Sequence, residues 1–132
     1  MATKQLHGWE LAVERGPGWV FVALRPPQNT DALHRPFDAD TPSLAEDLWE
    51  ILHQHLADRL ILQLDGVDFL TSHLIGQLVM LHKRIHSSGG IIRLCGLTPA
   101  NREVLHMAGL DSRFPHYDCR DDAIRGAPFK PR

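Results

Sequence analysis

The sequence lacks the features that mark membrane-spanning, secreted and cysteine-rich proteins. No apolar stretch approaches the roughly 18 residues needed to span a bilayer. The first residues, MATKQLHGW, contain no apolar core of a secretory signal. Only two cysteines occur, Cys95 and Cys119, and they form no CxxC pattern. Two cysteines leave a disulfide open, but they fit a reducing compartment. We therefore expect a cytoplasmic protein without membrane insertion.

The chain also lacks an excess of charge of either sign. Lys and Arg total 14 against 16 Asp and Glu, so the net charge is -2 with histidine neutral. No basic field therefore points to nucleic acid as a partner. A length of 132 residues with 43% hydrophobic content is enough for one domain with a buried core. We expect a single domain over residues 1–126, followed by a flexible, proline-containing tail over 127–132.

The apolar pattern alternates between strand-like and helix-like segments. Two short runs flank Arg15-Gly-Pro-Gly as in a β-hairpin, and later strands and helices then follow in turn. The segment 25–40 is rich in proline and has no periodicity, so it is predicted to be a long loop. The order predicts an α/β fold with a mixed sheet of about five strands and about four helices packed against it. The predicted strands are 9–14, 19–24, 60–64, 91–94 and 114–117, and the predicted helices start near 41, 72, 98 and 121 and end near 58, 87, 109 and 124.

The most informative run is LQLDGVDFLTSHLIG at residues 62–76. An apolar strand ends in a short acidic turn, where Asp65 and Asp68 are turn-forming residues. Ser72 then opens a helix, where free backbone N–H groups and the helix dipole would stabilise added negative charge. This position makes Ser72 a candidate for phosphorylation or for contact with a partner. The simpler alternative is that Ser72 or Thr71 only caps the helix.

Catalytic and metal-binding patterns have little support. His82 and His86 are four residues apart, but Lys83 and Arg84 lie between them and no HExxH occurs. Ser72 lacks the flanking glycines of a nucleophile elbow, and the glycine-rich loops that bind phosphates are absent. We expect no enzyme activity, no metal and no cofactor. A small histidine-using metal-binding protein or enzyme remains the least favoured alternative.

Three blocks of sequence resemble the STAS domain, the family of anti-sigma factor antagonists. They are the run 62–76, GGIIRLCGL at 89–97 and VLHMAGLD at 104–111, and the resemblance extends from about Leu44 to Ile124. The family motif Asp-Ser-Ser-Gly falls on Thr71, Ser72, His73 and Leu74, so only the phosphoacceptor position and a later glycine, Gly76, are retained. The resemblance therefore implies the fold more fully than it implies the phosphorylation switch.

The resemblance implies a regulatory module that acts by protein–protein contact. Its partner would be an anti-sigma factor of the serine-kinase type, which phosphorylates Ser72 and is released by that modification. Partner contacts would come from Asp68, Thr71, His73 and Leu74. A STAS scaffold that is never phosphorylated and stays bound in a larger assembly is the alternative, and a homodimer stays open.

Overall fold

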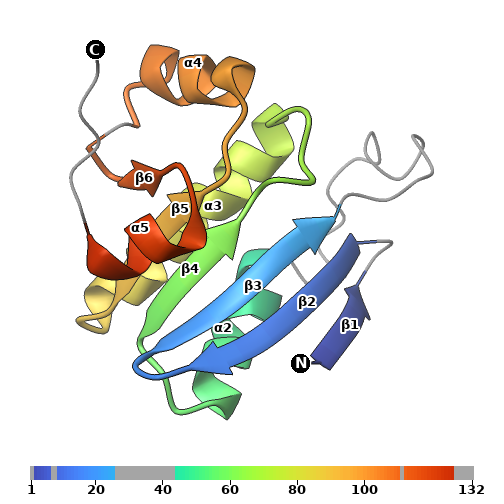
Figure 1. Cartoon of the computed structure of the whole chain (residues 1–132), viewed down its shortest axis with the longest axis vertical. Helices are drawn as coiled ribbons and strands as arrows, with labels where there is room; N and C mark the ends of the chain where they lie inside the picture. Colours follow the sequence, from blue (N-terminus) through green and yellow to red (C-terminus); the bar gives the residue numbers. More distant parts are fainter. Residues whose placement is uncertain (1, 7–8, 26–43, 111, 127–132) are drawn as a thin grey trace.

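The computed structural model describes residues 2–6, 9–25, 44–110 and 112–126. These residues form a six-stranded sheet with strand order β1-β2-β3-β4-β5-β6 (Figure 1). The first three strands pair antiparallel, and β3 to β6 pair parallel. The strands are β1 (Ala2–Leu6), β2 (Trp9–Gly16), β3 (Trp19–Arg25), β4 (Arg59–Gln63), β5 (Ile91–Cys95) and β6 (His116–Tyr117).

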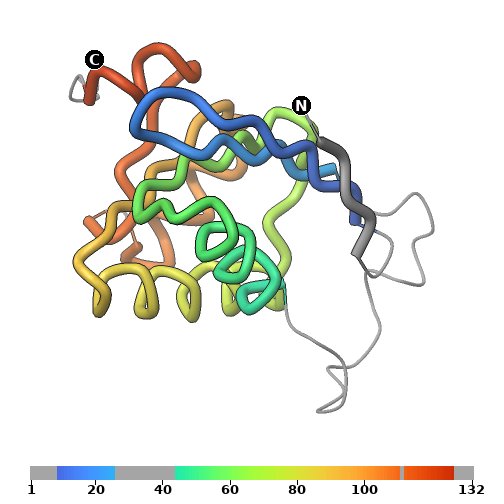
Figure 2. The backbone as a smooth tube through the Cα atoms, turned by 90° about the horizontal axis from the view of Figure 1, so that it is seen from below, coloured from blue at the N-terminus to red at the C-terminus, as the bar shows by residue number. Residues whose placement is uncertain are grey.

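Four helices are described, and they occupy both faces of the sheet and one of its ends. In Figure 2, α2 and α3 cover one face and α5 lies on the other. In Figure 1, α4 lies beyond the end of the sheet at which α3 begins. The helices are α2 (Leu44–Gln54), α3 (Ser72–Ser87), α4 (Pro99–Met107) and α5 (Arg120–Arg125).

The predicted α/β fold with its mixed sheet is confirmed. The central strand β4 is buried on both faces, since Leu60 and Leu62 lie in the main core while Ile61 lies in the smaller core under α5. This is the burial that a continuous apolar run predicts for an interior parallel strand. The bounds of α3 agree with the predicted 72–87.

Three local features differ from the sequence prediction. Strand β1 was not predicted, because its polar sequence carries no apolar alternation. Its pairing with β2 defines it as a strand. The predicted helix to Asp58 stops at Gln54, because Leu56 adopts a positive φ of 51° and its side chain is 91% exposed. Strand β6 is shorter than predicted, since Phe114 turns into the core instead of continuing the strand.

Several predictions fall outside the described residues. They concern the loop after Arg25, the proposed helix cap at Thr41 and Pro42, and the tail over 127–132.

Candidate functional site

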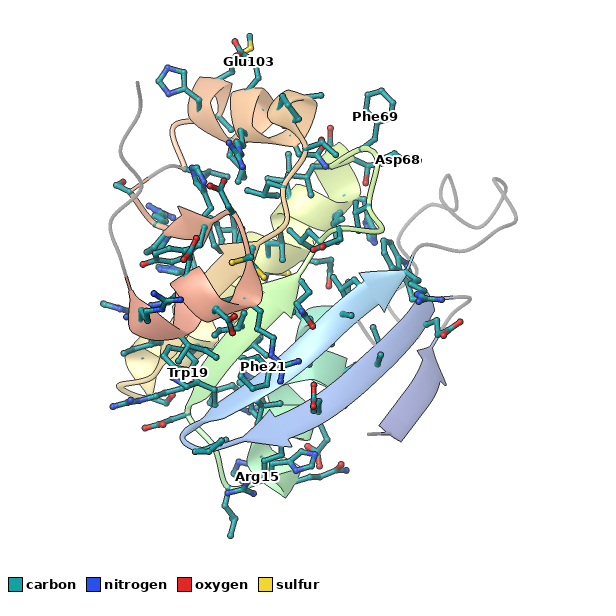
Figure 3. All side chains as sticks on the ribbon, viewed as in Figure 1. Arg15, Trp19, Phe21, Asp68, Phe69 and Glu103 are labelled. Carbon is teal, nitrogen blue, oxygen red and sulfur yellow. The ribbon has the colours of Figure 1, made fainter. Side chains whose placement is uncertain are left out.

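The loop between β4 and α3 buries two apolar side chains and exposes the two residues between them. Val67 and Leu70 are buried, whereas Asp68 and Phe69 are exposed. Phe69 has 73% of its surface exposed and points away from the body of the protein (Figure 3). The two buried residues therefore anchor the loop, and the residues between them form its outer surface.

A buried amide from α4 holds this loop in place. The Asn101 side chain is fully buried, and its Nδ2 donates a hydrogen bond to the Val67 carbonyl at 2.8 Å. Its Oδ1 accepts a hydrogen bond from the Leu70 backbone N–H at 2.9 Å. Because a buried polar group must be paired, these two bonds fix both sides of the exposed pair Asp68 and Phe69.

The start of α3 is capped by Thr71 rather than by Ser72. The Thr71 hydroxyl accepts a hydrogen bond from the Leu74 backbone N–H at 3.1 Å, and the Thr71 backbone is extended as at an N-cap. Ser72 is therefore the first helical residue, and its side chain is exposed. Thr71, and not Ser72, therefore supplies the hydroxyl that caps the helix.

The electrostatic setting of Ser72 suits an added anion. The first turn of α3 contains no acidic residue. The N-terminal end of a helix carries a partial positive charge of about half an elementary charge. A phosphate on Ser72 would therefore meet the favourable end of the dipole without a carboxylate in that turn.

The remaining predicted contact residues are not equally accessible. His73 and Asp68 are exposed, and Thr71 is partly exposed. Leu74 is 2% exposed and belongs to the main core, so its side chain is not available to a partner. Phe69 supplies the exposed apolar group at this position instead, which the sequence analysis missed.

The other turn residue, Asp65, is also exposed, and its carboxylate lies against Gly96, directly after β5. A Cβ built on Gly96 would approach Asp65 Oδ1 to 1.7 Å, and Gly96 has a φ of +75°. Both observations require glycine at this position. Asp65 is therefore part of the packing between the ends of β4 and β5.

The exposed face of α3 continues the surface that begins at Ser72. Successive residues of an α-helix are rotated by about 100°, so Lys83 lies only about 20° around the helix from Ser72. Gly76 lies between them, and a Cβ at that position would meet no atom within 4 Å. Glycine inside a helix costs roughly 1 kcal/mol relative to alanine. Because the fold itself leaves room for a side chain there, Gly76 leaves the helix backbone open to an approaching surface.

The histidine pair on α3 is brought together, and the described part of the chain places no third metal ligand beside it. The His82 and His86 rings stack at 5.7 Å between centroids, with an angle of 9° between planes. Burial lowers the pKa of His82, and the neighbouring His86 and Arg113 lower it further. Among the residues that the structure describes, no group of three His, Cys, Asp or Glu side chains is placed to hold a metal ion.

The cysteines occupy contrasting environments. Cys95 is 1% exposed, as its apolar strand predicted, and burial raises the pKa of its thiol to about 12. Cys119 is exposed, and both thiols are free. Neither cysteine belongs to the Ser72 surface.

Two buried polar residues that organise this region were not found from the sequence. Asn101 is one, and the other is Gln77, whose Oε1 accepts a hydrogen bond from the Ala45 backbone N–H at 3.0 Å. That bond ties the middle of α3 to the start of α2. Both residues are polar positions of amphipathic helices, so only the three-dimensional pairing reveals that they are buried.

In the helices that the structure describes, no segment is long and apolar enough to cross a membrane.

The mixed sheet, with an exposed serine at the start of α3, defines a small α/β domain in which the first residue of a helix is at the surface. A model of the STAS domain matches residues 36–123, more than half of the chain. The chain therefore belongs to the STAS domain family, as the sequence blocks predicted.

Individual relatives agree with this assignment. The chain is 27% identical over 75 residues to an anti-sigma F factor antagonist from Paenibacillus polymyxa, covering 57% of this chain and 64% of that protein. The match thus spans less than two thirds of the length of this relative.

Two solved structures share the fold at lower sequence identity. An anti-sigma factor antagonist from Mycobacterium paratuberculosis superposes with a TM-score of 0.69 and 22% identity, covering 91% of this chain and 94% of that one. The anti-sigma factor antagonist SpoIIAA in its unphosphorylated form superposes with a TM-score of 0.63 and 16% identity, covering 90% of this chain and 99% of that one.

Proposed function

We propose that this chain is a regulatory STAS module that binds a protein partner through the loop before α3 and the exposed face of that helix. The names of the relatives, anti-sigma factor antagonists, support an anti-sigma factor as the partner. The serine-kinase type of that partner is what the resemblance to the family implies. Such a module acts by binding in the cytoplasm and has no catalytic activity of its own. The observation that carries the proposal is the exposed Ser72 at the first position of a helix without an acidic first turn.

The proposed contact surface contains an exposed aromatic residue in the loop and an accessible stretch of the α3 backbone. Phe69 is the exposed aromatic residue of the loop, and aromatic residues are enriched among those that dominate binding energy. Asp68, Thr71 and His73 surround Ser72, and Gly76 continues the surface one turn further. Because Asn101 fixes the loop, little ordering is required when a partner binds.

Phosphorylation of Ser72 provides the switch in this proposal. It adds a charge of about -1.5 to -2. The helix N-terminus stabilises that charge within the free module, whereas a partner packed against Phe69 and Ser72 would have to bury it. Burial of an unpaired charge is strongly unfavourable, so the phosphorylated module is released.

Intact mass measurement tests the switch. The module is incubated with Mg-ATP and each anti-sigma-type serine kinase of the host organism. The wild type is expected to gain one phosphate, Ser72→Ala none, and the matched control Ser87→Ala one, since Ser87 is an exposed serine at the other end of the same helix. Phosphate uptake by Ser72→Ala would refute Ser72 as the acceptor.

A constitutive STAS scaffold is the second candidate function. The feature that favours it is the uncharged Thr71 at the position of the family aspartate, together with a buried Leu74 at the position of the family glycine. These replacements change the charge and shape beside Ser72. A partner complex that forms equally with Ser72→Asp would favour the scaffold over the switch.

A further inference from the structure

The charge along α3 is one-sided. No aspartate or glutamate occurs between Asp68 and Glu103, although the chain contains 16 acidic residues. Helix α3 lies within this acid-free stretch and carries Lys83, Arg84 and three histidines. The exposed face of α3 therefore contributes only positive or titratable charge.

Part of this charge lies on the same face of the helix as Ser72. Lys83 is about 20° around the helix from Ser72 and, at 11 positions along (83 − 72), roughly 16 Å away. His86 is exposed one turn beyond Lys83, and Met80, with 47% of its surface exposed, lies one turn before it. A continuous strip thus runs from Ser72 through an apolar group to a basic end.

Two cations at the basic end have no acidic partner among the residues that the structure describes. Three other arginines are engaged: Arg102 pairs with Asp118 at 2.6 Å, Arg120 pairs with Glu14, and Arg84 lies over the Trp49 ring. Within the described residues, Lys83 and Arg113 form no ion pair.

Arg113 joins the basic end from another part of the chain. It lies in the connection between α4 and β6, next to Phe114, whose ring packs edge-on against His82 at 5.3 Å. Arg113 is close enough to His82 to lower the pKa of that imidazole, and no acidic group contributes to the shift. Two segments distant in sequence therefore place positive charge at one corner, with no ion pair to it from the residues that the structure describes.

We infer that Met80, Lys83, His86 and Arg113 form a docking surface for an acidic segment of the protein partner. This inference rests on the proposed function, because it identifies the chemistry of the partner that covers Ser72. A typical interface buries about 800 Å² on each partner. Such an area has a diameter of about 30 Å if it is circular, so one partner covers both Ser72 and the basic end.

The surrounding charge favours a protein segment over nucleic acid as the occupant. The chain has a net charge of -2, and the neighbouring helix α2 exposes Glu46 and Glu50. Only a narrow basic strip is therefore available on this side of the protein. An extended phosphate backbone needs a broader basic surface, whereas a short acidic segment with an apolar side chain fits Met80 and the charges beside it.

A peptide titration of the full chain tests this surface. The probe is a short fluorescent peptide of alternating Glu and Leu residues, and its binding is read by anisotropy and by amide chemical shifts. We expect saturable binding that weakens as salt is raised, with shifts confined to Met80–Ser87 and to residues 112–114. Lys83→Glu and Arg113→Glu should each weaken binding about fivefold, because each removes an attraction and adds a repulsion.

Arg125→Glu is the matched control. It makes the same change of charge at an exposed arginine of α5, on the opposite face of the sheet, and should leave peptide binding unchanged. Equal weakening by Arg125→Glu, shifts elsewhere, or no saturable binding would overturn the inference. Tighter binding of a DNA duplex with the same dependence on Lys83 would overturn the choice of a protein segment.

Peptide binding and Ser72 phosphorylation, measured separately on the same protein, distinguish this inference from the proposed function. If the peptide fails to bind while kinases still phosphorylate Ser72, the docking surface is wrong and the switch stands. If the peptide binds as expected but no kinase modifies Ser72, the switch is wrong and the docking surface stands.

Discussion

The Asn101 side chain accepts a hydrogen bond from the Leu70 backbone N–H across 31 positions of the chain. The same amide donates to the Val67 carbonyl, so one buried side chain of α4 determines the path of the loop before Ser72. The position of Ser72 is therefore set by a tertiary contact as well as by its place in the sequence.

Replacing Asn101 should destabilise the domain and loosen the Ser72 loop. Asn101→Ala leaves the buried Val67 carbonyl and Leu70 N–H unpaired, which should lower the free energy of unfolding by about 2–4 kcal/mol. Denaturant unfolding measures this loss. Hydrogen exchange should show faster exchange at Leu70 N–H.

Asn101→Asp is the informative comparison. An aspartate keeps the acceptor for Leu70, and burial favours its neutral form, whose hydroxyl can still donate to the Val67 carbonyl. Exchange at the Leu70 amide should then stay slow relative to Asn101→Ala. Equal stability of wild type and Asn101→Ala would contradict the role assigned to this residue.

Removing the helix cap should lower the stability of the protein by less than replacing Asn101 does. Thr71→Ala removes the oxygen that accepts from Leu74 N–H and should cost about 1 kcal/mol of stability. Thr71→Ser keeps the hydroxyl and should recover most of that loss. Ser72→Ala should have little effect by the same measurement, because Ser72 does not cap the helix. A larger loss for Ser72→Ala than for Thr71→Ala would reverse the assignment of the cap.

The His82 environment predicts that stability falls in mild acid. Burial, with His86 and Arg113 nearby, holds the pKa of His82 in the folded protein below its usual value of about 6.5. Between the folded and unfolded pKa values the unfolded chain binds more protons, so stability decreases as the pH falls below about 7. The decrease ends once the pH is below the folded pKa, because both states are then protonated.

Two histidine variants isolate this effect in unfolding measured across the pH range. His82→Leu should flatten the dependence between neutral and mildly acidic pH, because it removes the titrating group. His53→Gln, at an exposed histidine near the end of α2, should keep the wild-type dependence. An unchanged pH dependence in His82→Leu would show that another group causes it.

The two thiols should differ in reactivity. The raised pKa of Cys95, about 12, leaves it protonated near neutral pH, and it is also buried. A thiol reagent should therefore modify the native protein once, at Cys119, and Cys119→Ser should abolish the reaction. The denatured protein should react at both positions. Rapid modification of native Cys119→Ser would show that the small core under α5 opens readily.

The sequence predicted the elements whose burial is periodic. The spacing of apolar residues in β4, β5 and α3 predicts which of their side chains are buried, because this pattern is local in the sequence. The candidate acceptor Ser72 was found for the same reason, since a strand, a turn and a helix start are local features. These elements are also those whose bounds agree best with the structure.

Features that depend on distant pairing were not predictable in this way. Strand β1 has a polar sequence, and pairing with β2 alone defines it. Asn101 resembles any polar helix residue until its contacts with the β4–α3 loop are known. Leu74 was expected at the surface because it aligns with a family glycine, but its place on the inner face of α3 buries it. Phe69 was not singled out from the sequence, because local spacing does not distinguish an exposed aromatic residue in a turn from a buried one.

The affinity of an anti-sigma-type kinase of the host for unmodified and Ser72-phosphorylated module tests the central claim most directly. Both forms come from one preparation, and calorimetry measures the dissociation constant of each. We expect binding of the unmodified form and at least a tenfold loss on phosphorylation, since a docked partner would have to bury the added charge. Equal affinity of the kinase for the two forms would contradict the account.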